Sequence, residues 1–186
     1  MKSEFWNTPN QLTLARLFFI PFINICIVEH RYHWALVLVV IAGLSDSLDG
    51  MAARLLHQQT RLGEYLDPIA DKLLLSSLFL VMSSSGMIAW RYTVMVFSRD
   101  LGILTISAVL YTVGLRDFRP GIFGKINTAC QIAAVFFALL AKVYPAEWIW
   151  MAGQVLLYGV FAFTLASAVH YVYLTGQRLK TLQASR

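Results

Sequence analysis

Six long apolar stretches, separated by short polar ones, account for most of this chain. Each stretch holds roughly 20 residues, which is the length that a helix needs to cross the hydrocarbon core of a bilayer. The pattern therefore predicts an all-α, polytopic membrane protein with six transmembrane helices. The predicted helices cover residues 12–28, 33–56, 66–85, 91–113, 125–143 and 148–174.

Composition supports a membrane protein and excludes several other classes. Apolar residues make up 58% of the 186 residues and charged residues 13%, which is about half of the charged fraction of ordinary globular proteins. Disordered chains, coiled coils and disulfide-rich secreted modules all have different compositions. The net charge of +5 does not indicate a nucleic-acid partner, because the basic residues are scattered among apolar segments. Cys26 and Cys130 lack the spacing of a zinc site.

Lysine and arginine are distributed unequally between the two sets of predicted loops and tails. The smaller set holds Arg31, Arg91 and Lys142, each close to an aromatic residue. Because cytoplasmic loops are enriched in Lys and Arg, this bias predicts that both chain termini are cytoplasmic. The larger set holds Lys2, Arg54, Arg61, Arg116, Arg119, Lys125, Arg178, Lys180 and Arg186.

The same pattern predicts one domain over residues 1–186. We expect an interfacial segment over 1–10, a six-helix core over 11–174 and a cytoplasmic tail over 175–186. The first apolar stretch is not followed by a small-residue cleavage site, so we expect it to stay in the protein. The expected location is the inner (plasma) membrane of a bacterium.

Four aspartates, Asp46, Asp49, Asp67 and Asp71, lie in or beside the second and third predicted spans. An ionised carboxylate is costly there unless it is paired, so such residues mark functional sites by default. Asp46 and Asp49 are three residues apart, and Asp67 and Asp71 are four apart, so the members of each pair share a helix face. Four carboxylates in one pocket would repel one another without cations, and oxygen ligands favour Mg²⁺ or Mn²⁺. We expect two divalent cations; for any single aspartate, a loop position is the alternative.

Residues 46–71 read DSLDGMAARLLHQQTRLGEYLDPIAD and match D-x2-D-G-x2-A-R-x8-G-x3-D-x3-D at all eight fixed positions. This segment resembles the signature of the CDP-alcohol phosphatidyltransferases, membrane enzymes of phospholipid synthesis with a six-helix core. The resemblance implies that an acceptor hydroxyl attacks CDP-diacylglycerol at the phosphorus that bears the diacylglycerol, and that CMP leaves. It implies that the active site is cytoplasmic and that the four aspartates hold the metal ions, with Asp71 as general base. The implied nucleotide and diphosphate contacts are Asp49, Gly50, Ala53, Arg54 and Gly63.

The segment Asn10-Gln11-Leu12-Thr13-Leu14-Ala15-Arg16 resembles the N-x-L-T-x-x-R segment of the phosphatidylglycerophosphate and cardiolipin synthase branches. Asn10, Thr13 and Arg16 are spaced three apart and share a helix face, so they would reach the CDP-diacylglycerol diphosphate. Helix capping combined with an interfacial arginine is the alternative for these residues.

Two further segments are similar to the cardiolipin synthases of the family. Glycerol-3-phosphate-using members usually have A-R-E where residues 98–100 read SRD, and K-x-K-T where residues 125–128 read KINT. Glycerol-3-phosphate is a dianionic monoester that favours an extra cation, whereas phosphatidylglycerol is a monoanionic diester. We therefore expect phosphatidylglycerol as the acceptor, with glycerol-3-phosphate as the alternative. The expected acceptor-binding residues are Arg99, Arg119, Lys125 and Asn127.

Two of these acceptor residues also have an ordinary structural interpretation. Arg99 would pair with Asp100 or a motif aspartate, and Asn127 would face solvent in a loop. A lipid acceptor must enter from the bilayer, so we also expect an apolar mouth near the fourth and fifth spans, formed by Ile122, Phe123 and Ile126.

Two rival functions and one assembly state follow from the same residues. An intramembrane prenyltransferase would have a second, distant Asp motif, and a cation transporter would have repeats or broken helices; neither is clear in this sequence. The resemblance implies a homodimer, and small residues of the last span suit either a dimer face or packing within the chain. These small residues are Gly153, Gly159, Ala162, Ala166 and Ser167.

Overall fold

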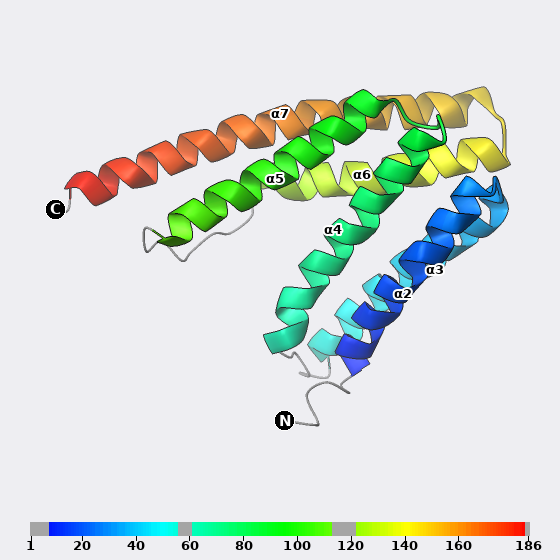
Figure 1. Cartoon of the computed structure of the whole chain (residues 1–186), viewed down its shortest axis with the longest axis horizontal. Coiled ribbons are helices and arrows are strands. Elements are labelled where there is room, and N and C mark those ends of the chain that lie inside the picture. Colours follow the sequence, from blue (N-terminus) through cyan, green and yellow to red (C-terminus); the bar gives the residue numbers. More distant parts are fainter. Residues whose placement is uncertain (1–7, 56–60, 113–121, 185–186) are drawn as a thin grey trace.

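The computed structural model describes residues 8–55, 61–112 and 122–184, and all regular structure in these ranges is α-helical (Figure 1). Side chains are described over 17–45, 70–105 and 122–169, except that of Phe123. The all-α prediction is confirmed for these ranges. The helices are α2 (Thr8–Val28), α3 (Tyr32–Leu55), α4 (Arg61–Ser84), α5 (Trp90–Thr112), α6 (Ile122–Val143) and α7 (Glu147–Ala184).

The six predicted apolar segments each coincide with one of these helices. Helices α4 and α7 extend furthest beyond their predicted stretches: α4 begins at Arg61 rather than 66, and α7 continues to Ala184 rather than 174. Pro68 therefore lies inside α4 and does not start it. Of the predicted interfacial segment and tail, residues 1–7 and 185–186 lie outside the described residues.

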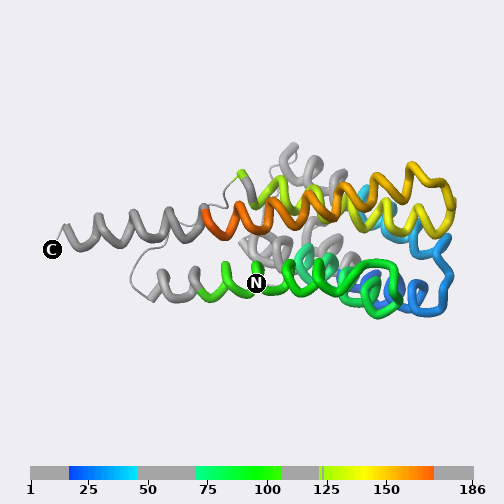
Figure 2. The backbone as a smooth tube through the Cα atoms, turned by 90° about the horizontal axis from the view of Figure 1, so that it is seen from above, coloured from blue at the N-terminus to red at the C-terminus, as the bar shows by residue number. Residues whose placement is uncertain are grey.

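The helices form three antiparallel hairpins whose connections, at 29–31, 85–89 and 144–146, lie at one end of the molecule (Figure 1). Viewed from above, α6 and α7 run side by side along the long axis (Figure 2). Helix α2 packs against α3 and α4, and α5 packs against α7 and α4. Helix α6 also contacts α3 and α4, so it links the α6–α7 hairpin to the other two hairpins.

Two of the connections begin with the same helix-ending motif. At the end of α2, His30 N–H donates to Ile27 O and Arg31 N–H to Cys26 O, and His30 has a φ of 58°. At the end of α4, Gly86 N–H donates to Ser83 O and Met87 N–H to Met82 O, and Gly86 has a φ of 68°. Both are Schellman motifs, in which a left-handed residue satisfies the last carbonyl groups of the helix.

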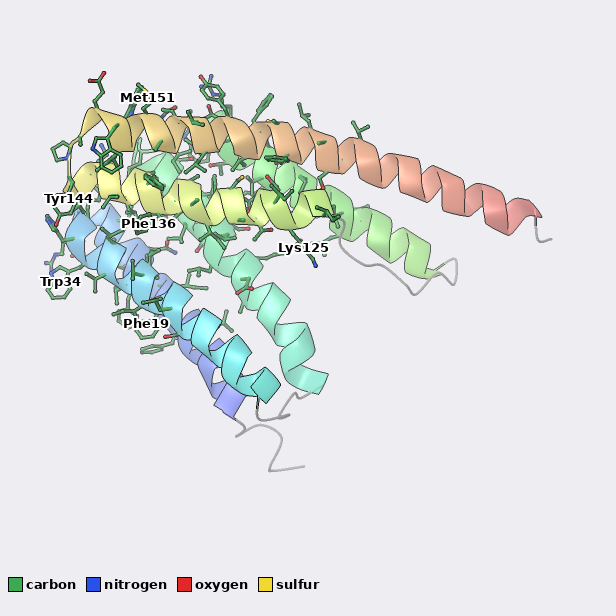
Figure 3. All side chains as sticks on the ribbon, turned by 180° about the vertical axis from the view of Figure 1, so that it is seen from behind. Phe19, Trp34, Lys125, Phe136, Tyr144 and Met151 are labelled. Atoms are coloured by element: carbon green, nitrogen blue, oxygen red, sulfur yellow. The ribbon has the colours of Figure 1, made fainter. Side chains whose placement is uncertain are left out.

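Apolar side chains fill the interior and also cover the outside. The buried cluster joins α2, α4, α5, α6 and α7 through residues such as Ile23, Phe79, Tyr92 and Leu139. Large apolar residues remain exposed on the outer faces, and Trp34 and Tyr144 lie near the connection end in Figure 3. An apolar exterior around an apolar core is typical of a protein whose solvent is lipid.

Within the described residues, two stretches are long and apolar enough to cross a membrane, Gly124–Val143 and Glu147–Val169. Only 28% of each is buried inside the protein, unlike a core helix of a soluble domain. Shorter apolar stretches occur in α2 and α3, at Leu17–Val28 and Tyr32–Ser45. The six-span topology therefore stays a prediction.

The small residues of the last span face the neighbouring helix at two positions. A Cβ added at Gly153 would lie 3.7 Å from the Cβ of Phe137, and one at Gly159 would lie 3.8 Å from the Sγ of Cys130. At these positions the small residues allow α7 to approach α6 of the same chain. The homodimer stays a prediction.

Candidate active site

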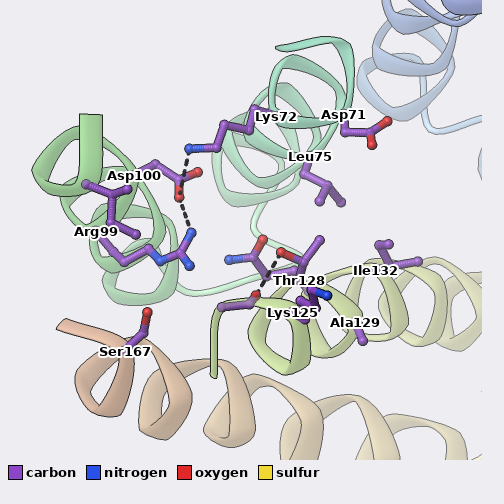
Figure 4. A pocket seen from close by; sticks show the side chains of 13 residues that line it. Asp71, Lys72, Leu75, Arg99, Asp100, Lys125, Thr128, Ala129, Ile132 and Ser167 are labelled. Carbon is purple, nitrogen blue, oxygen red and sulfur yellow. Dashed lines mark hydrogen bonds and ion pairs between the residues drawn. The ribbon is translucent and has the colours of Figure 1, made fainter. Parts of the chain in front are cut away.

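A cavity of about 530 Å³ lies among α4, α5, α6 and α7, and four helices contribute polar side chains to its wall (Figure 4). It lies towards the end of the bundle away from the connections, since Lys125 and Tyr144 are far apart in Figure 3. The lining residues are Asp71, Lys72, Leu75, Arg99, Asp100, Ile103, Gly124, Lys125, Thr128, Ala129, Gln131, Ile132 and Ser167.

Three charged side chains form a connected cluster on one side of this cavity. Arg99 Nη1 donates to Asp100 Oδ1 at 2.6 Å, and Lys72 Nζ lies 3.7 Å from the same oxygen. The side chains of Arg99 and Asp100 are only 10% and 17% exposed. Such a pair is poorly screened, and its remaining polar groups need partners. With Lys125, three cations and two carboxylates line the cavity, which suits an anionic ligand.

Gly124 on α6 determines how closely the Arg99 guanidinium approaches that helix. A Cβ built at Gly124 would lie 3.0 Å from Arg99 Nη2, closer than an ordinary van der Waals contact. Arg99 Nε is buried and has no hydrogen-bond partner among the described residues. The guanidinium is therefore held by Asp100 and by the bare backbone of α6 while one of its donors remains available.

Asp71 is the motif aspartate whose side chain is described, and it borders two cavities. Besides the large cavity, it lines a second one of about 100 Å³ between α3, α4 and α6. Gly43 of α3 lines that second cavity too, and Asp46 follows Gly43 by three residues. Helices α3 and α4 therefore flank this space at Asp71, within one turn of the position of the first motif aspartate.

These residues fit the expected divalent cations by donor type and by helix placement. Asp46 and Asp49 belong to α3, and Asp67 and Asp71 belong to α4. Among the described side chains, no three His, Cys, Asp or Glu residues gather as a metal site. The side chains of Asp46, Asp49 and Asp67 lie outside the described ones, so the four-ligand set stays a prediction.

The acceptor residues expected from the sequence divide into three groups. Arg99 and Lys125 line the large cavity, and Arg99 also pairs with Asp100. Asn127 is fully buried in α6 and is absent from the cavity lining; Thr164 Oγ1 of α7 donates to its Oδ1 at 3.4 Å. The alternative of a solvent-facing Asn127 in a loop is therefore wrong. Arg119 lies outside the described residues.

The nucleotide-contact residues lie outside the described side chains, although their helices are described. Helix α2 holds Asn10, Thr13 and Arg16. The contact residues of the central motif belong to α3 and α4. Their roles stay predictions: Asn10, Thr13, Arg16, Asp49, Gly50, Ala53, Arg54 and Gly63.

Four polar cavity residues were not expected from the sequence: Lys72, Thr128, Gln131 and Ser167. Thr128 Oγ1 donates to Gly124 O at 3.1 Å, which leaves its oxygen lone pairs to accept hydrogen bonds. Gln131 follows Thr128 by three residues, so the two share a face of α6. This spacing could have indicated from the sequence that they line the same cavity. Ser167 carried no such signal, because its place depends on how α7 packs.

The family model described as CDP-alcohol phosphatidyltransferase matches residues 6–166, which is most of the chain. The chain belongs to the CDP-alcohol phosphatidyltransferase family. The resemblance inferred from residues 46–71 is thereby confirmed. Membership in this phosphatidyltransferase family argues against the prenyltransferase and cation-transporter alternatives.

Named relatives of this CDP-alcohol phosphatidyltransferase carry two kinds of name. A human protein named cardiolipin synthase (CMP-forming) is 32% identical over 198 residues, covering 96% of this chain and 64% of that protein. An Aquifex aeolicus protein named CDP-diacylglycerol–glycerol-3-phosphate 3-phosphatidyltransferase is 32% identical over 168 residues, covering 89% and 93%. A Bacillus subtilis protein of that same name is 30% identical, covering 95% and 98%. The chain thus spans slightly less than two thirds of the human relative.

Proposed function

We propose that this protein transfers the phosphatidyl group of CDP-diacylglycerol to phosphatidylglycerol, forming cardiolipin and releasing CMP. The observation that carries the choice of acceptor is an apolar groove that meets the charged cavity. The groove has a volume of about 630 Å³ and lies between α4 and α5. It is lined mainly by Leu73, Leu80, Trp90, Val94, Phe97, Leu101 and Leu104.

Lys72 and Asp100 line both the groove and the cavity, so the two spaces adjoin at this ion pair. A phospholipid acceptor has this same division, with an anionic headgroup joined to apolar chains. Its phosphodiester would lie beside Arg99 and Lys125 while an acyl chain lay in the groove. The apolar entrance for a lipid was expected near α5 and α6, where Ile122 and Ile126 are exposed. The groove between α4 and α5 offers a second path from the bilayer to the cavity.

The position of Asp71 on the cavity wall supports its proposed role as general base. Asp71 accepts the proton of the acceptor's primary hydroxyl as that oxygen attacks the phosphorus that bears the diacylglycerol. The bond from this phosphorus to the CMP oxygen breaks as the new P–O bond forms, and CMP keeps the electron pair. No covalent enzyme intermediate is required. Bound at Asp46, Asp49, Asp67 and Asp71, Mg²⁺ or Mn²⁺ would neutralise charge on the diphosphate.

Glycerol-3-phosphate is the second candidate acceptor, and the number of cations favours it. Lys72, Arg99 and Lys125 all line the cavity, which is enough positive charge for a dianionic monoester. The Aquifex aeolicus and Bacillus subtilis relatives carry names of that activity. A soluble acceptor, however, leaves the adjoining groove without a role in the reaction.

The deciding experiment is product identity with purified protein. CDP-diacylglycerol is offered with phosphatidylglycerol or with glycerol-3-phosphate, and the lipid product is identified by mass spectrometry. We expect cardiolipin from phosphatidylglycerol, loss of turnover with chelator, and recovery with Mg²⁺ or Mn²⁺. Asp71→Asn should lose about 100-fold or more in kcat while still binding CDP-diacylglycerol. Phosphatidylglycerophosphate as the only product would overturn the choice of acceptor and leave the transfer chemistry intact.

We also propose that all six helices span the membrane, with both termini and the cavity on the cytoplasmic side. The apolar exterior supports membrane insertion, and the distribution of Lys and Arg supports the orientation.

A further inference from the structure

Helix α6 buries two amide side chains one turn apart, and both have donors without partners among the described residues. Asn127 is 0% exposed and Gln131 is 4% exposed. Asn127 Nδ2 and Gln131 Nε2 make no hydrogen bond to any part of the chain that the structure describes. A buried donor without a partner is costly, and apolar surroundings offer no replacement. Each therefore requires an explanation.

The two amides differ in what they face. Asn127 is held from α7 by Thr164 and is absent from the cavity wall. Gln131 lines the cavity, as do the Thr128 hydroxyl and the buried Ser167 hydroxyl. Gln131 therefore borders the cavity with a buried donor that has no partner among the described residues, whereas Asn127 is enclosed between helices.

The cavity wall thus has both charged and neutral polar groups. The charged ones are Asp71 and Lys72 on α4, Arg99 and Asp100 on α5 and Lys125 on α6, and the neutral ones are Thr128 and Gln131 on α6 and Ser167 on α7. Charged groups recognise a phosphate, whereas an amide with both N–H donors and a carbonyl acceptor complements a hydroxyl group. A ligand with a phosphate and a free hydroxyl matches both kinds of group.

We infer that Gln131 is a specificity residue that hydrogen-bonds the secondary hydroxyl of the acceptor's glycerol, the hydroxyl that is not phosphatidylated. This inference rests on the proposed function, because both candidate acceptors present a glycerol with a primary hydroxyl for attack and a secondary one beside it. The secondary hydroxyl gives the Gln131 amide its missing partner. Binding it also orients the primary hydroxyl towards the reacting phosphorus.

The test compares two acceptors that differ in this hydroxyl alone. Phosphatidylglycerol is compared with phosphatidyl-1,3-propanediol, which keeps the primary hydroxyl and lacks the secondary one. We expect the wild-type protein to favour phosphatidylglycerol about tenfold or more in kcat/KM, because a site built for a hydroxyl disfavours an analogue that lacks it. Gln131→Met, of similar volume, should lower kcat/KM for phosphatidylglycerol about tenfold and leave that for the analogue within about threefold.

Asn127→Leu is the matched control, since it removes an equally buried amide of the same helix that does not line the cavity. It should change kcat/KM for both acceptors by the same factor, so the preference stays. Thermal unfolding verifies that each variant folds, and Gln131→Leu serves if Gln131→Met does not. The inference is wrong if the Gln131 variant lowers kcat/KM equally for both acceptors. It is also wrong if the wild-type protein does not discriminate between phosphatidylglycerol and the analogue.

Failure of the proposed acceptor gives a different result. If wild-type protein makes only phosphatidylglycerophosphate, the comparison is repeated with glycerol-3-phosphate and 3-hydroxypropyl phosphate, which again differ only in the secondary hydroxyl. Loss of preference in Gln131→Met alone would then support the role of Gln131 with the other acceptor. An unchanged preference would overturn it.

Discussion

The Arg99 guanidinium occupies a position that a single methyl group would alter. Asp100 holds Nη1 from within α5, and Nη2 lies where only a glycine at position 124 leaves room. Because the contact is with the far end of a flexible side chain, a methyl group at 124 would displace the guanidinium rather than separate the helices.

Gly124→Ala should therefore weaken acceptor binding more than it weakens the fold. We expect the KM for the acceptor to rise several-fold, with kcat within about twofold and the unfolding temperature little changed, since the added Cβ moves one phosphate donor by a few tenths of an ångström. Steady-state kinetics and thermal unfolding in detergent measure both. A large loss of stability with unchanged KM would show that Gly124 serves helix packing instead.

At the residue scale, the sequence predicted that Arg99 and Lys125 belong to the site, and both line the cavity. It did not predict the neutral lining residues Thr128, Gln131 and Ser167. Charged residues in apolar segments are conspicuous because lipid penalises them. Gln131 and Ser167 are less costly to bury, and only the packing of α6 against α7 determines that both line the cavity. Asn127 illustrates the limit, since its sequence position suggested acceptor contact and the structure encloses it beside Thr164.

Helix positions followed from hydrophobicity, but helix ends did not. An apolar stretch reports the thickness of a bilayer, whereas a helix continues as long as its backbone hydrogen bonds and side-chain propensities permit. Helix α7 therefore continues through polar residues to Ala184. By contrast, α4 ends at Ser84 because Gly86 adopts the left-handed conformation two residues later.

Two glycine substitutions test this helix ending by their opposite effects. A Cβ meets nothing within 4 Å at either Gly86 or Gly102, so contacts do not decide the outcome. Gly86 has a φ of 68°, and Gly86→Ala should lower the free energy of unfolding by about 1 kcal/mol. Gly102 lies inside α5, and Gly102→Ala should raise it by about 0.5–1 kcal/mol. Chemical or thermal unfolding of both variants measures the difference, and equal shifts would contradict it.

The arrangement of the whole molecule relates the cavity to one side of the membrane. The three connections lie together at one end (Figure 1), and the same end holds Arg31, Arg91 and Lys142, the smaller basic set. Lys125 and the cavity lie towards the other end (Figure 3). A bundle of hairpins places its connections at the end opposite the cavity whichever way it is inserted in the membrane. The orientation therefore depends on the distribution of Lys and Arg.

Accessibility of introduced cysteines tests that orientation. With Cys26 and Cys130 replaced by alanine, Glu29→Cys and Glu147→Cys place thiols at the connection end, where both native residues are exposed. We expect a membrane-impermeant maleimide to label these two in intact cells, and to label Arg186→Cys only in inverted vesicles, because the Lys- and Arg-rich tail stays cytoplasmic. Labelling of Arg186→Cys in intact cells would reverse the orientation and place the cavity on the outer side. CDP-diacylglycerol on the cytoplasmic side, the donor in the proposed reaction, would then be unable to reach Asp71.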